Sequence, residues 1–368
     1  MQTFDDIEIH RPQLARGYLQ LLEAQPSRPL ALFAPRRVGK TFFLDHDLTP
    51  LARKSGFVTV YADLWLHKKA PLEAINHALE EALDDATVPT HAVTKVARAP
   101  VRKVAGLEFG DEPKPRALPS APELRLDTLV GRLAKAAGKR ALLMLDEIQA
   151  LSDVPDGESI VATLRAVLQK RKRQVSAVFT GSSQEGLAAM VAASGGPMYQ
   201  FAQLLDFPAL GDEYLELLTD HFAQIHKGKR LDIERLHEVF AWLGHKPALL
   251  KDLVKSMSAD GITDIDFALK RMMTDEKQVA GWRGLLAGLK PLERAVLIQI
   301  AQDRSPLGKE TLQVLRGVAG LKPTLSKVRT ALESLKRAGI LARRGGNYAV
   351  EDRLFAEYLG KLESPFAI

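Results

Sequence analysis

The sequence contains no cysteine among its 368 residues, which excludes disulfide bonds, thiol nucleophiles and thiolate metal sites. Its apolar runs fall short of the ~18 residues that a transmembrane helix needs, and the acidic N-terminus lacks a signal-peptide pattern. No histidine is placed for metal binding, because His221 and His226 are five residues apart and off one helical face. We therefore expect a cytoplasmic protein with no membrane partner.

The composition is that of a globular chain, with 46% hydrophobic and 26% charged residues, and the length suits two or three domains. The net charge of +6 is unevenly distributed. From Leu285 onward there are 14 Lys and Arg against 8 Asp and Glu, a difference of +6, so the remainder is balanced. A basic C-terminal segment indicates either a nucleic-acid partner or only a solvated basic surface.

The most informative motif fits the phosphate-binding loop pattern of Ala or Gly, four residues, then Gly-Lys-Thr. A short apolar strand is expected at 29–33, before the loop, and a helix with an apolar face follows it. Strand, loop and helix in this order predict that the chain binds a nucleoside triphosphate. The motif runs from Ala34 to Thr41, and the expected cofactor-binding residues are Pro35, Arg36, Arg37, Val38, Gly39, Lys40, Thr41 and Phe42.

Each residue type in this loop has a physical role. Gly39 lets the backbone curl so that its N–H groups point at phosphate oxygens. Lys40 would reach the β- and γ-phosphates as a catalytic residue, and the Thr41 hydroxyl would ligate Mg²⁺. The helix that begins near Gly39 directs its positive dipole end at the same phosphates.

A second motif ends the apolar run 141–145, which predicts a strand buried on both faces. Asp146 follows as an expected Mg²⁺ ligand, in the manner of a Walker B aspartate. Glu147 is the expected catalytic base, since a carboxylate there can orient and deprotonate the attacking water. The alternative is a strand that merely ends in two surface acids, and the upstream phosphate loop favours the functional interpretation.

Strand and helix patterns alternate through residues 1–210, which predicts an α/β fold: a doubly wound parallel-sheet P-loop NTPase core. Residues 87–122 interrupt the pattern and indicate an insertion, with one possible strand at 104–109. Residues 211–284 are helical throughout and predict a lid. The expected strands are 29–33, 57–65, 141–145, 175–180 and 201–207, and the expected helices are 13–23, 72–84, 124–137 and 160–169.

Residues 285–368 predict a C-terminal winged-helix domain, because three helical segments precede two short strands around a Gly-Gly turn. Its third helix, 324–337, would enter the major groove of DNA, and its wing would meet phosphates. The alternative is a winged helix that packs on the core or binds protein. The residues expected to contact DNA are Thr324, Lys327, Arg329 and Thr330 on the helix and Arg343 and Arg344 on the wing.

Together these motifs resemble the archaeal-type P-loop ATPases of the STAND group, which are relatives of the AAA+ ATPases. The resemblance covers nearly the whole chain. Ala34 replaces the usual Gly, and Lys246 interrupts the usual Gly-x-Pro spacing of the lid. The segments that carry the resemblance are Pro35 to Thr41, Leu145 to Glu147, Phe179 to Ser183, Gly244 to Leu250 and Tyr348 to Phe355.

The resemblance implies ATP and Mg²⁺ as ligands, and a polar residue after the 175–180 strand that senses the γ-phosphate. Ser182 is the expected catalytic sensor, with Thr180 and Ser183 as alternates. Because a small hydroxyl can bind phosphate or cap the next helix, the two roles stay open for Ser182.

No arginine finger is assigned from the sequence. Arg165, Arg171 and Arg173 precede the sensing strand and could act in trans across a homo-oligomer. Basic residues at a helix C-terminus also occur simply as a solvated end that matches the helix dipole. Arg36 and Arg37, inside the phosphate loop, could contact phosphate or a partner.

Two functions are expected from the sequence. The first is an Mg-dependent ATPase that acts as a nucleotide-dependent switch or motor on double-stranded DNA. The second is a STAND-type signalling switch whose winged helix contacts protein. Stimulation of ATP hydrolysis by DNA would distinguish them.

Overall fold

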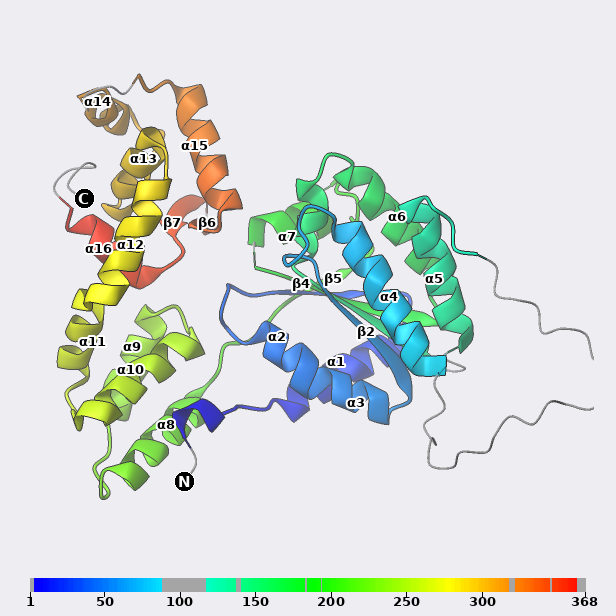
Figure 1. Ribbon diagram of the computed structural model, residues 1–368, viewed down its shortest axis with the longest axis horizontal. Helices are drawn as coiled ribbons and strands as arrows, with labels where there is room; N and C mark the ends of the chain where they lie inside the picture. Colours follow the sequence, from blue (N-terminus) through cyan, green and yellow to red (C-terminus); the bar gives the residue numbers. More distant parts are fainter. Residues whose placement is uncertain are drawn as a thin grey trace, which may run out of the picture.

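The computed structural model describes residues 3–87, 117–136, 140–182, 184–192, 194–317, 322–344 and 346–362. An α/β lobe and a helical lobe lie side by side, and the helical lobe carries a β-hairpin (Figure 1). The strand expected at 104–109, most of the 87–122 insertion and Ser183 lie outside the described residues. None of the helices in the described ranges combines the length and apolarity of a membrane span.

A five-stranded parallel sheet forms the centre of the α/β lobe and confirms the predicted fold class. The strand order is β2-β3-β4-β1-β5. Strand β2 ends two residues before the expected boundary, because the Asp63 carboxylate accepts a hydrogen bond from the Trp65 N–H (2.8 Å) and turns the chain. The strands are β1 (Leu30–Phe33), β2 (Phe57–Asp63), β3 (Arg140–Asp146), β4 (Val175–Gly181) and β5 (Gln203–Asp206).

The sheet separates two apolar cores, one on each of its faces. Successive side chains of β1 point alternately into the two cores. Leu30 and Leu32 face one core, and Ala31 faces the other. On the first face lie α1 (Pro12–Ala24) and the consecutive helical segments α2 (Lys40–Phe42), η2 (Phe43–Leu48, a π-helical turn) and α3 (Thr49–Lys54). On the second face lie α4 (Pro71–Thr87), α5 (Pro122–Ala136), α6 (Gly157–Lys170) and α7 (Gln184–Val191). Short 3₁₀ turns occur at η1 (Phe4–Asp6) and η3 (Ile148–Asp153).

The helical lobe has one continuous apolar core, which extends from Phe4 near the N-terminus to Leu359. This core does not break at residue 284, so the predicted boundary between lid and C-terminal domain stays a prediction. Three helices followed by a hairpin do occur in the order expected for residues 285–368. The elements are α8 (Asp212–Ile225), α9 (Ile233–Trp242), α10 (Pro247–Asp260), α11 (Ile265–Thr274), α12 (Glu276–Gly288), α13 (Pro291–Ala301), α14 (Lys309–Gly317), α15 (Leu325–Arg337), β6 (Leu341–Arg344), β7 (Asn347–Val350) and α16 (Arg353–Gly360).

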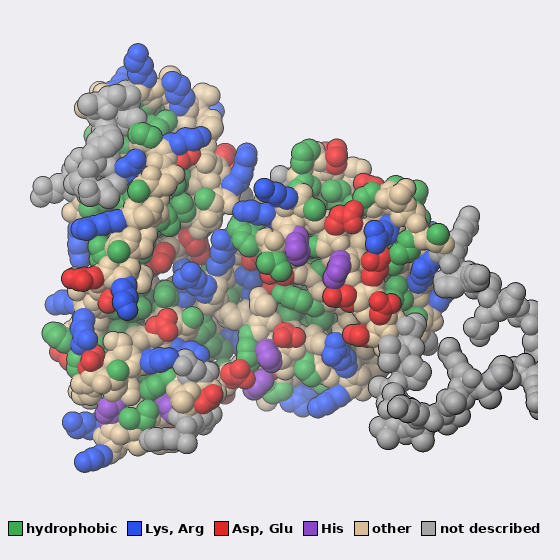
Figure 2. Space-filling view, viewed as in Figure 1, with side chains coloured by type: hydrophobic (Ala, Val, Ile, Leu, Met, Phe, Trp, Pro, Cys, Tyr) green, Lys and Arg blue, Asp and Glu red, His purple; other side chains and the backbone are tan. Residues whose placement is uncertain are grey.

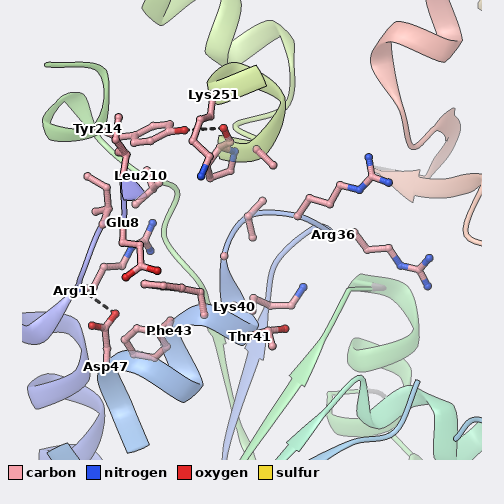
Figure 3. Close-up of a pocket in the computed structure, with 18 of the residues that line it drawn as sticks. Glu8, Arg11, Arg36, Lys40, Thr41, Phe43, Asp47, Leu210, Tyr214 and Lys251 are labelled. Atoms are coloured by element: carbon pink, nitrogen blue, oxygen red, sulfur yellow. Dashed lines mark hydrogen bonds between the residues drawn. The ribbon is translucent and has the colours of Figure 1, made fainter. Parts of the chain in front are cut away.

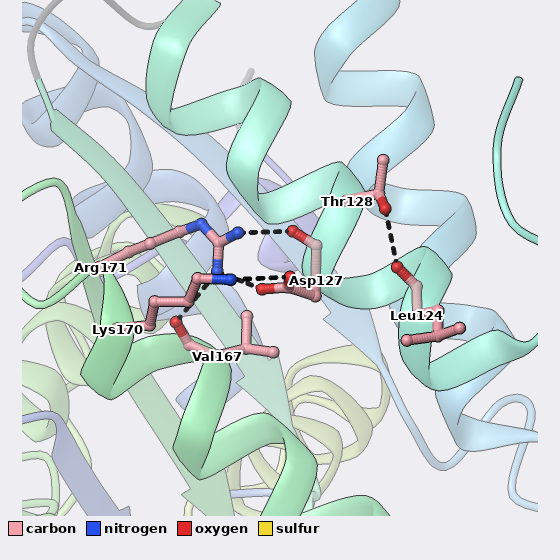
Figure 4. A network of polar contacts seen from close by, with 6 residues as sticks. All are labelled: Leu124, Asp127, Thr128, Val167, Lys170 and Arg171. Carbon is pink, nitrogen blue, oxygen red and sulfur yellow. Dashed lines mark hydrogen bonds and ion pairs between the residues drawn. The ribbon is translucent and has the colours of Figure 1, made fainter. Parts of the chain in front are cut away.

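A polar network ties α5 to the C-terminal end of α6 (Figure 4). Asp127 accepts hydrogen bonds from Lys170 (3.0 Å) and Arg171, and the Arg171 guanidinium also donates to the Asp127 carbonyl (2.8 Å). The Arg171 side chain is only 12% exposed. It packs against Gly131, where an added Cβ would lie 2.8 Å from Nη2. Arg171 is therefore bound within its own chain.

We expect Asp127→Asn to lower the free energy of unfolding by about 1 kcal/mol at pH 7. This value is smaller than for a buried ion pair, because the carboxylate is 35% exposed and water screens its charge. The hydrogen bond from Arg171 holds the pKa of Asp127 below its usual range. A lowered folded-state pKa gives stability that is present above the unfolded value near 4 and is lost as the pH falls through the folded value. Urea unfolding at pH 7 and pH 3 measures this. Asp85→Asn, at an exposed position on α4, is the control, and an equal effect at both pH values would contradict the assignment.

Candidate functional site

The loop between β1 and α2 has the curled backbone that a phosphate cradle requires. Gly39 has φ +92° and Arg37 has φ +66°, so two of its residues occupy the left-handed region. For an arginine this conformation costs on the order of 1 kcal/mol, and such strain is often found at ligand-binding loops. Both residues line the cavity described below.

Lys40 lies folded against its own loop. Its Nζ donates to the carbonyl oxygens of Ala34 (2.5 Å) and Pro35 (3.1 Å), and the residue is 6% exposed. Burial lowers the pKa of Lys40, while the nearby Glu147 and Asp146 oppose that effect. A desolvated cation whose partners are only neutral carbonyls is ready to bind an anion.

Asp146 is 3% exposed, and both of its carboxylate oxygens are occupied. Oδ2 accepts from the Thr41 hydroxyl (2.7 Å) and the Tyr61 hydroxyl (3.2 Å). Oδ1 accepts from the Glu147 N–H (3.0 Å) and the Thr180 hydroxyl. Burial and the Asp146 charge raise the pKa of Tyr61, so its hydroxyl remains a donor. Thr180, the alternate sensor, thus orients Asp146.

The residues around Asp146 fit a magnesium ion. Among the described residues, no group of three or more His, Asp and Glu side chains could hold a metal, so Mg²⁺ would depend on few protein ligands. Thr41 Oγ1 and Asp146 Oδ2 are 2.7 Å apart, and both are hard oxygen donors. Mg²⁺ is commonly bound by one or two protein oxygens together with water and substrate phosphates.

The Glu147 carboxylate is held by three donors. Its Oε2 accepts from the Ser182 hydroxyl (2.6 Å), the Ser182 N–H (3.3 Å) and the Gln149 amide. Glu147 itself has φ +57°, an uncommon conformation for a residue other than glycine. The expected base and the expected sensor are therefore hydrogen-bonded to each other.

Two arginines of the phosphate loop face the same site. Arg36 donates from Nε to the Ser182 hydroxyl (3.3 Å), and its guanidinium lies 4.1 Å from the centre of the Trp65 ring. Arg37 is exposed and lines the cavity. Of the other arginines considered from the sequence, Arg165 donates to the Pro197 carbonyl (3.0 Å), so it too has a partner within the chain.

These residues open onto a cavity of about 480 Å³ between the two lobes. In Figure 3, Lys40 and Thr41 lie below the cavity, Lys251 above it, and Glu8 and Arg36 on opposite sides. The residues expected to bind phosphate lie on one side, and the rest of the lining mixes apolar side chains from both lobes with the charged Glu8, Arg11, Asp47 and Lys251. The lining residues are Ile7, Glu8, Ile9, Arg11, Arg36, Arg37, Val38, Gly39, Lys40, Thr41, Phe42, Phe43, Asp47, Glu147, Leu210, Tyr214, Pro247, Ala248 and Lys251.

Sequence reasoning missed the cavity wall made by residues 7–11 and by α8 and α10. Arg11 connects residues 7–11 to η2 and to the segment before α8, because its N–H donates to Asp47 (3.0 Å) and its Nη1 donates to the Pro208 carbonyl (2.5 Å). Tyr214 donates to the Pro247 carbonyl (2.6 Å). In the sequence, the Gly244–Pro247 turn was the feature that could have indicated this wall, because Pro247 begins α10 and lines the cavity.

The residues expected to contact DNA lie on the C-terminal part of the helical lobe. The Thr324 hydroxyl caps α15 by accepting from the Lys327 N–H (3.3 Å), and Lys327, Arg329 and Thr330 are exposed. Arg343 Nε donates to the Gly346 carbonyl (3.0 Å), and Arg344 belongs to β6. On the coloured part of this end in Figure 2, Lys and Arg side chains are more frequent than Asp and Glu side chains.

Comparisons with known proteins add information about the fold. No protein-family model matches the sequence, and no curated protein matches it significantly. Among solved structures, the chain is similar to the Walker-type ATPase PABY2304 of Pyrococcus abyssi, with a TM-score of 0.60 and 18% identity over 96% of each chain. It is also similar to the ORC2 protein of Aeropyrum pernix, solved as ADPNP–ADP complexes, with a TM-score of 0.53 and 16% identity over 94% of this chain and 90% of that one. The chain thus has the fold of an archaeal-type P-loop ATPase.

Proposed function

We propose that this chain binds ATP with Mg²⁺ between its two lobes and hydrolyses it. The observation that carries the proposal is the convergence of two separate segments, Lys40–Thr41 and Asp146–Glu147: Lys40, Thr41 and Glu147 line one cavity, and Asp146 is hydrogen-bonded to Thr41. A curled loop, a buried cation, two oxygen ligands and a carboxylate base are the parts that phosphoryl transfer to water requires.

In the proposed reaction, the phosphates draw Lys40 away from the Ala34 and Pro35 carbonyls, and its ammonium neutralises charge on the β- and γ-oxygens. Thr41 and Asp146 would hold Mg²⁺, which would supply further neutralisation of the phosphate charge. Glu147 orients the attacking water and accepts its proton. Its Oε2 already accepts three hydrogen bonds from Ser182 and Gln149, so this oxygen would accept the proton only after one of those bonds is broken. Apolar side chains of the lining, among them Ile9, Phe42 and Leu210, would contact the nucleoside.

We further propose that ATP binding and hydrolysis drive a switch or motor on duplex DNA through a C-terminal winged helix. The basic excess after Leu285 and the exposed Lys327 and Arg329 on α15 support it. A signalling switch whose winged helix contacts protein is the alternative. Lys246, at the start of α10, donates to the carbonyl of Glu351 (2.6 Å). This bond joins the proposed lid to the segment after the hairpin. It supports communication between the two in both alternatives and does not distinguish them.

Steady-state ATP hydrolysis, measured with and without duplex DNA, tests the proposal. Hydrolysis that requires Lys40 and rises with DNA supports the DNA-coupled ATPase. Hydrolysis that requires Lys40 but proceeds at the same rate with and without DNA supports the protein-binding switch. If the protein neither binds nor hydrolyses ATP, the proposal is wrong.

For DNA binding, we expect the double variant Lys327→Ala, Arg329→Ala to lower the slope of log Kd against log salt concentration by about 2, since each lost phosphate contact removes roughly 0.9 from the slope. Fluorescence anisotropy with a labelled duplex at several salt concentrations measures the slope. Lys277→Ala, an exposed position on α12, should leave it unchanged. An unaltered slope in the double variant would remove α15 from the DNA interface.

A further inference from the structure

Arg36 is the point at which the phosphate loop meets the C-terminal part of the helical lobe. Gly339 follows α15 and approaches the Arg36 guanidinium so closely that an added Cβ would lie 2.2 Å from Nη1 and 2.9 Å from Cζ. The centre of the Trp65 ring lies 4.1 Å from the Cζ atom of the same guanidinium. The arginine therefore contacts both a turn of one lobe and a ring of the other.

The turn at Gly339 has a local cause. Gly339 has φ +71°, its N–H donates to the Lys336 carbonyl (2.8 Å), and the Ile340 N–H donates to the Leu335 carbonyl (3.0 Å). This is the αL termination by which glycine ends a helix. The missing side chain thus serves two purposes, because it permits the positive φ and it leaves space for Arg36.

The same guanidinium acts on the proposed base through Ser182. Arg36 Nε donates to the Ser182 hydroxyl oxygen (3.3 Å), and that hydroxyl donates to Glu147 Oε2 (2.6 Å). A hydroxyl that accepts from one neighbour directs its own proton at another, so Arg36 favours the bond from Ser182 to Glu147. A carboxylate oxygen occupied in this way is a poorer acceptor for the proton of a water molecule.

We propose that Arg36 is a positioning residue through which the docked Gly339 turn restrains Glu147. While Gly339 covers the guanidinium, Arg36 remains hydrogen-bonded to the Ser182 hydroxyl, and that hydroxyl remains hydrogen-bonded to Glu147. When the turn moves away or Arg36 is displaced, the Ser182 hydroxyl loses this donor and its bond to Glu147 weakens, so that Glu147 is held mainly by Gln149 and the Ser182 N–H. Docking of the C-terminal part of the chain thereby slows hydrolysis. This inference rests on the proposed ATP hydrolysis.

Gly339→Ala in the full-length protein is the test, because its methyl group would displace Arg36. Gly261→Ala is a matched control: Gly261 also terminates a helix, with φ +68°, and an added Cβ there meets no atom within 4 Å. We expect Gly339→Ala to raise kcat for ATP hydrolysis about threefold or more, with KM within about twofold of the wild type. Gly261→Ala should change neither.

Double variants show whether the effect passes through the named residues. In a Ser182→Ala background, Gly339→Ala should no longer raise kcat, because the hydroxyl that carries the restraint is gone. If Gly339→Ala does not fold, as judged by circular dichroism beside Gly261→Ala, Arg36→Lys is used instead. It keeps the charge, removes the Nε donor and should also raise kcat.

The inference is overturned if folded Gly339→Ala has an unchanged or lower kcat, or if Gly261→Ala raises kcat as much as Gly339→Ala does. It is also overturned if Gly339→Ala raises kcat fully in the Ser182→Ala background, or if Arg36→Lys lowers kcat. Each of these leaves the proposed function intact if the wild type hydrolyses ATP and Lys40→Ala does not. A wild-type protein that does not hydrolyse ATP would overturn both.

Discussion

Glu147→Gln is expected to lower kcat for ATP hydrolysis by about 10²–10⁴-fold while ATP still binds. Glutamine keeps the shape of the side chain and can still contact Ser182, but it cannot accept the proton of the attacking water. Glu147 follows Asp146, which the Thr41 and Thr180 hydroxyls hold in place, so the geometry of the phosphate end should survive. Phosphate release at saturating ATP, together with Kd from a fluorescent ATP analogue, measures the two effects separately.

Glu158→Gln provides the control, because Glu158 is exposed in the first turn of α6. Its kcat should equal that of the wild type. If Glu147→Gln retained full activity, Glu147 would be excluded as the base. If ATP binding were lost as well, Glu147 would be required for the architecture of the site.

Lys40→Ala is expected to weaken ATP binding by roughly a hundredfold, or about 3 kcal/mol, the upper range for a hydrogen bond to a charged group. The cation is buried, and its pKa is lowered mainly by desolvation. In the free protein its partners are the Ala34 and Pro35 carbonyls, so the phosphates would supply its first opposite charge within hydrogen-bonding distance. Isothermal titration calorimetry with ATP and Mg²⁺ measures the loss.

The matching control is Lys54→Ala, at an exposed position in the last turn of α3. It should bind ATP as the wild type does. If Lys40→Ala bound ATP with unchanged affinity, the loop would not be the phosphate site, whatever its pattern.

The phosphate loop and the Asp146–Glu147 pair could be located from the sequence because each is a run of adjacent residues beside a strand. Tyr61 could not be found in this way, because its bond to Asp146 depends on β2 lying next to β3. A strand pattern predicts burial and does not predict which strands are neighbours. The hydrogen bond from Gln149 to Glu147 depends on the conformation of the turn after β3, which no periodicity encodes.

The cavity wall at residues 7–11 was missed for a related reason. These residues form no periodic element, and hydrophobic periodicity is the main signal that a single sequence offers. Their position depends on packing between distant segments, since Ile7 belongs to the apolar core of the helical lobe. The same limit applies to Gly339, whose contact with Arg36 joins residues some 300 positions apart.

Arg11 has a mechanical consequence. The chain passes between the lobes at residues 7–11 and again at 207–211, since Ile7 and Leu210 pack with the helical lobe and Phe207 packs with the sheet. Arg11 fastens the two passages together through the Pro208 carbonyl, and its guanidinium lies 4.8 Å from the centre of the Phe207 ring. We expect two adjacent, bonded connections to resist twisting more than bending about one axis. A lobe with one continuous core would then move as one body once Gly339 leaves Arg36, and its far end at α14 would travel farther than the residues at the cavity.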